Sequence, residues 1–115
     1  MEPKFPSKAK QQPWNPADAT DEIRRIARSE TMRLTRSDHA RERMEERDLL
    51  MGDVLYVLKN GFVYENPEPS TQQGLFKYEI ESQSPNSGNR SVRIVIIPDS
   101  GRCWLKVITV MWVDE

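Results

Sequence analysis

Residues 90–113 read RSVRIVIIPDSGRCWLKVITVMWV, and this stretch decides the fold of the chain. Its first part, RSVRIVIIP, is rich in β-branched residues and predicts a strand, and CWLKVITVMWV predicts a second one. The four residues DSGR between them are typical of a tight hairpin. Both strands are apolar on two faces, which indicates a central position in a sheet that helices cover at least in part on one side. The even spacing of Trp104 and Trp112 predicts that both lie on one face.

Two further strands precede this hairpin and extend the sheet. FVYEN (62–66) predicts a short strand, and PEPSTQQG after it predicts a loop. In LFKYEIES (75–82) the period is two residues, with Phe76, Tyr78 and Ile80 on one face and charged residues on the other. Tyr78 is therefore expected in the core. Together with the hairpin, these segments predict an antiparallel meander of three to four strands.

Helical patterns come before the strands. The first helix is expected to be capped by Thr20, and the second to run from Asp38 to about Arg47 with Ser37 as its cap. A third helix covers roughly residues 52–59 and stops at Gly61. Residues 34–36 are expected to form a short extended break. The fold class is therefore α+β, with two to three N-terminal helices packed on a three- to four-stranded antiparallel β-meander.

The chain of 115 residues is expected to form one domain over residues 20–115, preceded by a flexible, proline-rich arm over residues 1–19. The net charge is −1, so no overall basic field attracts nucleic acid. No apolar run approaches the ~20 residues of a membrane helix, and the N-terminal residues lack the apolar segment of a secretory signal. Cys103 is the single cysteine, which excludes an intrachain disulfide. The expected location is the cytoplasm, and no metal or cofactor is expected.

The stretch 37–47, SDHARERMEER, contains the single histidine of the chain. On a helix, His39, Arg43 and Arg47 form one stripe, because each step of four residues advances by 400°. The positions one residue later are apolar and face the core, so the stripe flanks the buried side. Two guanidiniums beside His39 favour its neutral form, which suits a general base, while the arginines can hold an anion. Metal-independent cleavage of a phosphodiester by a ribose 2′-OH needs such a set of groups.

A surface role explains the same residues. Acidic residues interleave with the arginines, and pairs three or four residues apart, such as Asp38 and Arg41, brace an exposed helix. From Arg24 to Arg47 the chain has eight arginines, no lysine and five acids. Arginine suits phosphate recognition, and it is also a good helix former. The composition leaves both interpretations open.

The order S-x-H-A-x-x-R-M-x-E-R, a short helix ending in Asn-Gly, and a last strand with Val107-Ile108-Thr109 resemble a small bacterial family of uncharacterised domains. Members of that family are often encoded beside MqsA-type antitoxins. More distantly, the chain is similar to BrnT and RelE-type toxins of the barnase–EndoU–colicin–RelE superfamily. The resemblance covers about residues 34–113. It implies an RNA-cleaving toxin, with RNA, free or ribosome-bound, as substrate and a cognate antitoxin protein as partner.

The sequence departs from the toxins at the end of the sheet. BrnT- and RelE-like chains commonly have an arginine, histidine or tyrosine there, whereas this chain has tryptophan and acids. The remaining groups of the site are then expected elsewhere. The candidates for substrate binding are Arg41, Lys77, Arg90 and Arg93, and the further candidates are Tyr64, Tyr78 and Lys106. Arg93, in a central strand, is expected to face a functional surface or a carboxylate.

The leading hypothesis is a metal-independent endoribonuclease, the toxin of a type II toxin–antitoxin pair. In it, His39 transfers protons, and Arg43 and Arg47 hold phosphate. The alternative is a non-catalytic binding module of the same fold that grips a protein partner or nucleic acid. In a third interpretation the stripe only braces the surface of its helix.

Overall fold

Three helices and six strands follow one another along residues 11–115, the part of the chain that the computed structural model describes. They are α1 (Pro16–Ala27), β1 (Arg33–Arg36), α2 (Asp38–Glu46), α3 (Met51–Asn60), β2 (Phe62–Val63), β3 (Glu68–Pro69), β4 (Phe76–Ser82), β5 (Val92–Asp99) and β6 (Trp104–Trp112). A short 3-10 turn, Ser100–Arg102, joins β5 to β6 where the sequence predicts a hairpin. The α+β class is confirmed.

The sheet is mixed, which corrects the expected antiparallel meander. Its strands lie in the order β1-β6-β5-β4-β2, and β3 also pairs with β4. The pairs among β2, β4, β5 and β6 are antiparallel, but β1 runs parallel to β6, with Arg33 opposite Trp104 and Arg36 opposite Val107. A four-residue strand is too short to show a period of two residues, so the sequence predicts only an extended break there.

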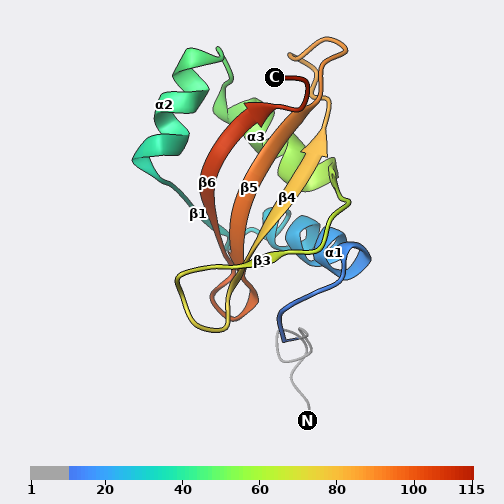
Figure 1. Ribbon diagram of the computed structural model, residues 1–115, viewed down its shortest axis with the longest axis vertical. Helices are drawn as coiled ribbons and strands as arrows, with labels where there is room; N and C mark the ends of the chain where they lie inside the picture. Colours follow the sequence, from blue (N-terminus) through green and yellow to red (C-terminus); the bar gives the residue numbers. More distant parts are fainter. Residues whose placement is uncertain (1–10) are drawn as a thin grey trace.

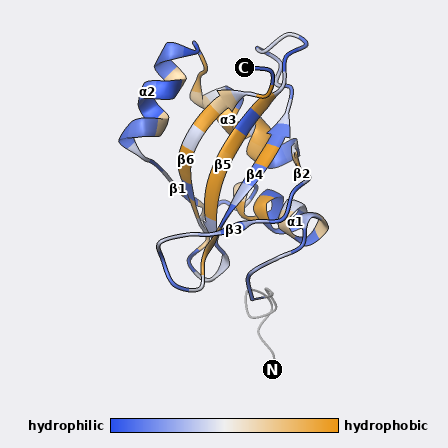
Figure 2. Ribbon diagram, in the orientation of Figure 1, coloured by the Kyte–Doolittle hydropathy of each residue, from blue (hydrophilic) through white to orange (hydrophobic). Residues whose placement is uncertain are grey.

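Helices α1 and α3 cover one face of the sheet, and the core lies between them and the strands (Figure 1). Figure 2 shows apolar residues concentrated on the central strands and on α3, whereas α2 is largely hydrophilic. The fully buried side chains include Ile23, Ile26, Val54, Val57, Leu58, Tyr78, Ile80, Ile94, Ile96, Leu105 and Val107. The expected core position of Tyr78 is confirmed, and burial raises the pKa of its phenol to about 12.

Helix α1 begins at Pro16 with Asn15 as its N-cap, five residues before the predicted cap at Thr20. Asn15 accepts a hydrogen bond from the backbone N–H of Asp18 (2.8 Å), with proline following the cap. Thr20 is buried inside the helix instead. Its hydroxyl donates to the Pro16 carbonyl (2.9 Å) and accepts from the Val63 N–H (2.9 Å), which ties α1 to β2.

The predicted arm over residues 1–19 includes a tryptophan that belongs to the core. Trp14 is buried, stacks on Tyr78 with 5.3 Å between ring centres, and donates its backbone N–H to the Tyr78 hydroxyl (2.9 Å). Gln12 anchors the same segment, because its side chain donates to the Pro98 carbonyl and accepts from the Phe76 N–H. Residues 1–10 of the arm lie outside the described residues.

A β-bulge in β6 separates the two tryptophans. Thr109 and Val107 pair with consecutive residues of β5, which leaves Ile108 without a partner in that register. The extra residue reverses the alternation along β6, so Trp112 packs against the core and Trp104 lies on the opposite face. The prediction that both share one face is wrong, because even spacing fixes a face only in a regular strand.

Gly61 follows α3 at a point where the helix meets β4. Its φ of −80° is open to any residue, so the need for glycine does not come from its backbone conformation. A Cβ atom there would lie 2.7 Å from the Val57 carbonyl oxygen and 2.8 Å from the Glu81 carbonyl oxygen. The predicted helix stop is confirmed, and the requirement for glycine comes from the close approach of the two backbones.

Replacing Gly61 by alanine should lower the free energy of unfolding by about 1–3 kcal/mol, because the added methyl group must push two backbone segments apart. Gly52→Ala is the matched control, since nothing lies within 4 Å of a Cβ atom at that position in the same helix. The control should be neutral or stabilising by up to about 1 kcal/mol. Urea unfolding followed by circular dichroism measures both, and equal effects would contradict the close-approach explanation.

Candidate functional site

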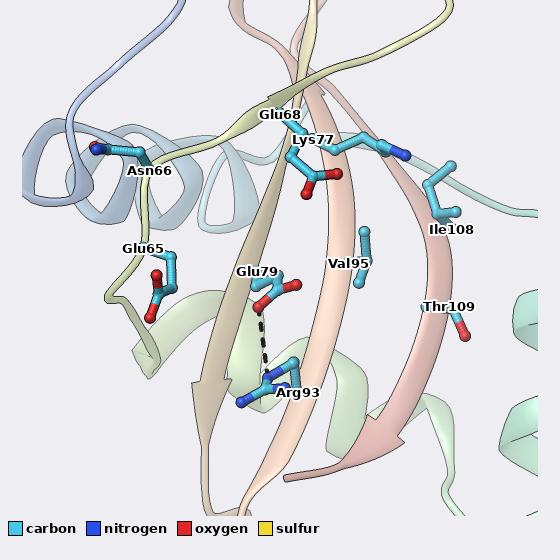
Figure 3. Close-up of a pocket in the computed structure, with 9 residues that line it drawn as sticks. All are labelled: Glu65, Asn66, Glu68, Lys77, Glu79, Arg93, Val95, Ile108 and Thr109. Carbon is cyan, nitrogen blue, oxygen red and sulfur yellow. Dashed lines mark ion pairs between the residues drawn. The ribbon is translucent and has the colours of Figure 1, made fainter.

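The face of the sheet opposite the core carries a pocket of about 520 Å³, here called the sheet pocket. The residues that line it are Glu65, Asn66, Glu68, Lys77, Glu79, Arg93, Val95, Ile108 and Thr109 (Figure 3). The strand register explains this set: Glu79, Val95 and Thr109 form one row across β4, β5 and β6, and Glu68 lies opposite Lys77. Their side chains alternate along the strands with those of the core.

Charges of both signs line the sheet pocket. Arg93 donates to Glu81 at its edge (2.8 Å) and lies 3.7 Å from Glu79, the ion pair drawn in Figure 3. The expected contact of Arg93 with a carboxylate is therefore present. Two cations, Lys77 and Arg93, against three glutamates give the lining a formal charge of −1. This pocket is mildly acidic and unlike a phosphate site.

The bulge of β6 links the sheet pocket to α2. It brings two consecutive residues, Ile108 and Thr109, into the pocket lining. The Ile108 carbonyl accepts a hydrogen bond from the Ser37 hydroxyl (2.8 Å), and the Val107 carbonyl accepts one from the Ser37 N–H (3.0 Å). The Ser37 hydroxyl also accepts from the Ala40 N–H (3.0 Å), so Ser37 is the N-cap of α2 as predicted.

The predicted His39–Arg43–Arg47 stripe lies on α2, outside the lining of the sheet pocket. Arg43 donates through Nε to the exposed His39 at Nε2 (3.4 Å) and through Nη1 to Glu46 (2.9 Å). Arg47 donates to the same Glu46 oxygen (3.1 Å) and through Nε to Glu115 (2.7 Å). A second contact joins Arg47 Nη2 to the other Glu115 oxygen. The stripe therefore forms as predicted, and carboxylates of the chain itself hold its arginines.

Two of the candidate substrate-binding arginines are also paired within the chain. Arg41 forms an ion pair with Asp38 (2.6 Å), the bracing contact that the sequence suggests. Arg90 forms one with Asp114 (2.8 Å), and its guanidinium carbon lies 4.0 Å from the centre of the Trp112 ring. Neither arginine belongs to the lining of the sheet pocket.

The three further candidates do not share one place. Tyr64 is exposed and stacks beside Phe62, Lys106 is half-buried on β6, and Tyr78 lies in the core. Of the predicted site residues, the structure thus brings Lys77 and Arg93 together in one pocket and the histidine–arginine stripe together on one helix.

The arginine-rich segment from Arg24 to Arg47 uses its side chains within the fold. Arg24 donates to the carbonyls of Asn60 and Gly61 (both 2.9 Å) and Arg28 to that of Lys59 (2.6 Å), so they satisfy the C-terminal end of α3. The other contacts are Arg25 with Glu22, Arg33 with Trp104, Arg36 with Met44, Arg41 with Asp38, and Arg43 and Arg47 with Glu46. For the segment as a whole, this favours a structural use of arginine.

The sequence did not single out the glutamates of the sheet pocket, or the glutamate that binds Arg47, as site residues. Glu65 and Glu68 fall in a predicted strand end and loop, where no periodicity places them over the sheet. Glu79 shares a face with Lys77 in the alternating pattern of residues 75–82, and that signal was sufficient to find it. Nothing in the sequence indicates that Glu115 reaches Arg47, a contact between residues 68 positions apart.

Helices on one face of a mixed sheet and a charged pocket on the other define a small α+β domain. Residues 36–112 match a family described as a domain of unknown function, DUF4258, and the chain belongs to this family. The match runs from the residue before the α2 cap to the end of β6. Comparisons with curated proteins and with solved structures find no match.

Among residues 11–115, no group of three or more histidine, cysteine, aspartate or glutamate side chains is placed to hold a metal ion. None of the helices in this part of the chain is both long and apolar enough to cross a membrane.

The pairing of Arg47 with Glu115 has a measurable signature. Hydrogen bonds from Arg47 and from the Trp112 backbone N–H lower the pKa of Glu115 to about 2, from an ordinary value of 4.5. Because the pKa in the folded state is lowered, the pair stabilises the fold fully above about pH 4.5 and loses that effect as the pH falls toward 2. The hydrogen bond from Arg90 likewise lowers the pKa of Asp114.

We expect Arg47→Gln to raise the pKa of the Glu115 carboxyl toward its ordinary value and to leave that of Asp114 unchanged, because a different arginine holds each carboxylate. Arg90→Gln should raise the pKa of the Asp114 carboxyl and leave that of Glu115 unchanged. Carbon-detected NMR titration of the side-chain carboxyls measures both groups in each variant. A Glu115 pKa that stays near 2 in Arg47→Gln would contradict the pairing.

Proposed function

We propose that this domain is a non-catalytic binding module that grips a protein partner in the sheet pocket. The observation that carries the proposal is the pocket itself, a hollow on the face of the sheet that the helices leave uncovered. Its floor includes the apolar side chains Val95 and Ile108, and charged groups surround them. Apolar contact framed by polar groups is typical of protein–protein interfaces.

The charge of the pocket supports a polypeptide occupant over nucleic acid. Protein surfaces that bind nucleic acid are strongly positive, whereas two cations and three carboxylates line this pocket. Arg93 is already neutralised by Glu79 and Glu81. The remaining carboxylates, Glu65 and Glu68, favour a partner segment with a lysine or arginine side chain.

A photo-crosslinker at Thr109 should trap a protein in the cells that produce this chain, because that side chain lines the pocket. The same group at Ala17, an exposed position on α1 that does not line the pocket, is the control and should give no such adduct. Glu65→Lys/Glu68→Lys should reduce the yield of the Thr109 adduct about tenfold, which corresponds to a loss of about 1.4 kcal/mol of binding free energy when both charges are reversed.

Mass spectrometry identifies the adducts, and thermal unfolding confirms that each variant is folded. An adduct with RNA at Thr109, or protein adducts of equal yield at Thr109 and Ala17, would contradict a protein-binding sheet pocket.

A second candidate function is metal-independent RNA cleavage by 2′-OH attack, and the geometry of His39 favours it. His39 is exposed, and its Nε2 accepts a hydrogen bond from Arg43 Nε (3.4 Å), which places the imidazole beside a guanidinium. The ion pair between Arg43 and Glu46 is largely exposed, and such pairs stabilise a fold by only roughly 0.2–1 kcal/mol. A phosphate group can therefore replace the Glu46 carboxylate beside Arg43. The likeness to BrnT and RelE-type toxins supports the same function, with a cognate antitoxin as the partner.

On this second proposal, His39→Ala should abolish growth inhibition on induction and reduce RNA cleavage by about 10²-fold or more, the usual contribution of a general base. Glu42→Ala, an exposed position on the same helix, is the control and should retain both effects. Growth curves and gel analysis of total RNA, with and without ribosomes, provide the measurement. Equal toxicity of wild type and His39→Ala would exclude His39 as a catalytic residue, and intact RNA in every case would exclude the enzyme.

A further inference from the structure

Two arginines at one end of the sheet hold the two successive carboxylates Asp114 and Glu115. Arg47, at the end of α2, contacts both oxygens of Glu115, and Arg90, before β5, contacts both oxygens of Asp114. Both pairs thus have the two-pronged geometry that guanidinium groups adopt with carboxylate and phosphate alike.

The surroundings fix the arginines in place. The Arg90 guanidinium lies over the Trp112 ring at 4.0 Å. Arg47 shares one oxygen of Glu46 with Arg43, so a second arginine stands beside it, and its side chain is only 17% exposed. A fixed guanidinium loses less freedom when it binds an anion, so these positions are prepared for one.

We propose that Arg47 and Arg90 form a site for two neighbouring anionic groups, that Asp114 and Glu115 occupy it within the chain, and that a ligand with two adjacent phosphates displaces them. An external anion can compete for both guanidiniums, because Asp114 and Glu115 are themselves in contact with solvent. Phosphate offers the same two-oxygen face as carboxylate and carries more charge. The two acidic residues therefore act as an internal competitor that sets the affinity of the site for external anions.

The site is separate from the sheet pocket, and the inference stands without either proposed function. None of its four charged residues lines that pocket. A diphosphate-type small molecule and the backbone of a single-stranded nucleic acid share the required chemistry, because both carry adjacent phosphate groups. The test therefore uses one probe of each kind.

The experiment compares Asp114→Asn/Glu115→Gln with a charge-matched control, Glu42→Gln/Glu45→Gln. The control removes two exposed carboxylates of α2 that make no contact with Arg47 or Arg90 among residues 11–115. The probes are inorganic pyrophosphate, followed by NMR of the arginine Nε–H groups, and fluorescein-labelled hexauridylate, followed by anisotropy at low salt. Removal of the internal competitor should tighten binding of at least one probe about tenfold, and the control should change it less than twofold.

Adding Arg47→Gln or Arg90→Gln to the Asp114→Asn/Glu115→Gln variant should abolish the gain, and circular dichroism verifies the fold of each protein. Tighter binding of pyrophosphate supports a small-molecule source, and tighter binding of hexauridylate alone supports a nucleic-acid source. If the variant and the charge-matched control bind both probes equally, or if the gain survives both arginine substitutions, the two carboxylates only brace the fold and the proposal is wrong.

Discussion

The N–H and hydroxyl of Ser37 join three features that are far apart in the sequence. The N–H bonds to Val107 where β1 ends against β6, and the hydroxyl bonds to Ile108 in the bulge while it caps α2. Only Ala40 and Met44 of α2 are buried, so this helix has little apolar surface with which to hold its position. The cap therefore sets where α2 lies beside the sheet, and with it the place of the histidine–arginine stripe.

The net charge of −1 is not evenly distributed: arginines are concentrated on the helices, and glutamates on the open face of the sheet. Arg24 of α1 donates to the carbonyls at the end of α3, and Arg43 and Arg47 pair with carboxylates on α2 or after β6. The sheet face instead carries glutamates around Arg93 and Lys77. The number of arginines in the sequence does not show whether each one caps a helix, pairs with a carboxylate or binds phosphate, because all three roles use the same residue.

Local periodicity predicted most of the fold. The Ser37 cap of α2, the end of α3 before Gly61 and the strands of the last hairpin follow from patterns within ten residues. The start of α1 was also readable, since Asn15 followed by proline is a good helix start, but the proline content favoured an arm. The parallel β1 could not be predicted, because its pairing with β6 joins residues about 70 positions apart. The bulge at Ile108 could not be predicted either, because it is set by the register of β6 against β5 and leaves no mark in the local pattern. The charged residues of the sheet pocket on β4 were visible in the alternation, whereas the presence of two consecutive β6 residues, Ile108 and Thr109, in its lining depends on the bulge.

The limits of the family match separate the two sets of contacts that hold Arg47. The match covers residues 36–112, which include Ser37, the stripe and Glu46, but it ends before Asp114 and Glu115. One carboxylate partner of Arg47 therefore belongs to the matched domain, and the other comes from the residues after it. Because Glu115 supplies the two-pronged contact and Glu46 a single one, the stronger constraint on Arg47 comes from a residue after the matched range. The position of the Arg47 guanidinium therefore depends on a carboxylate that follows β6 as well as on one of its own helix.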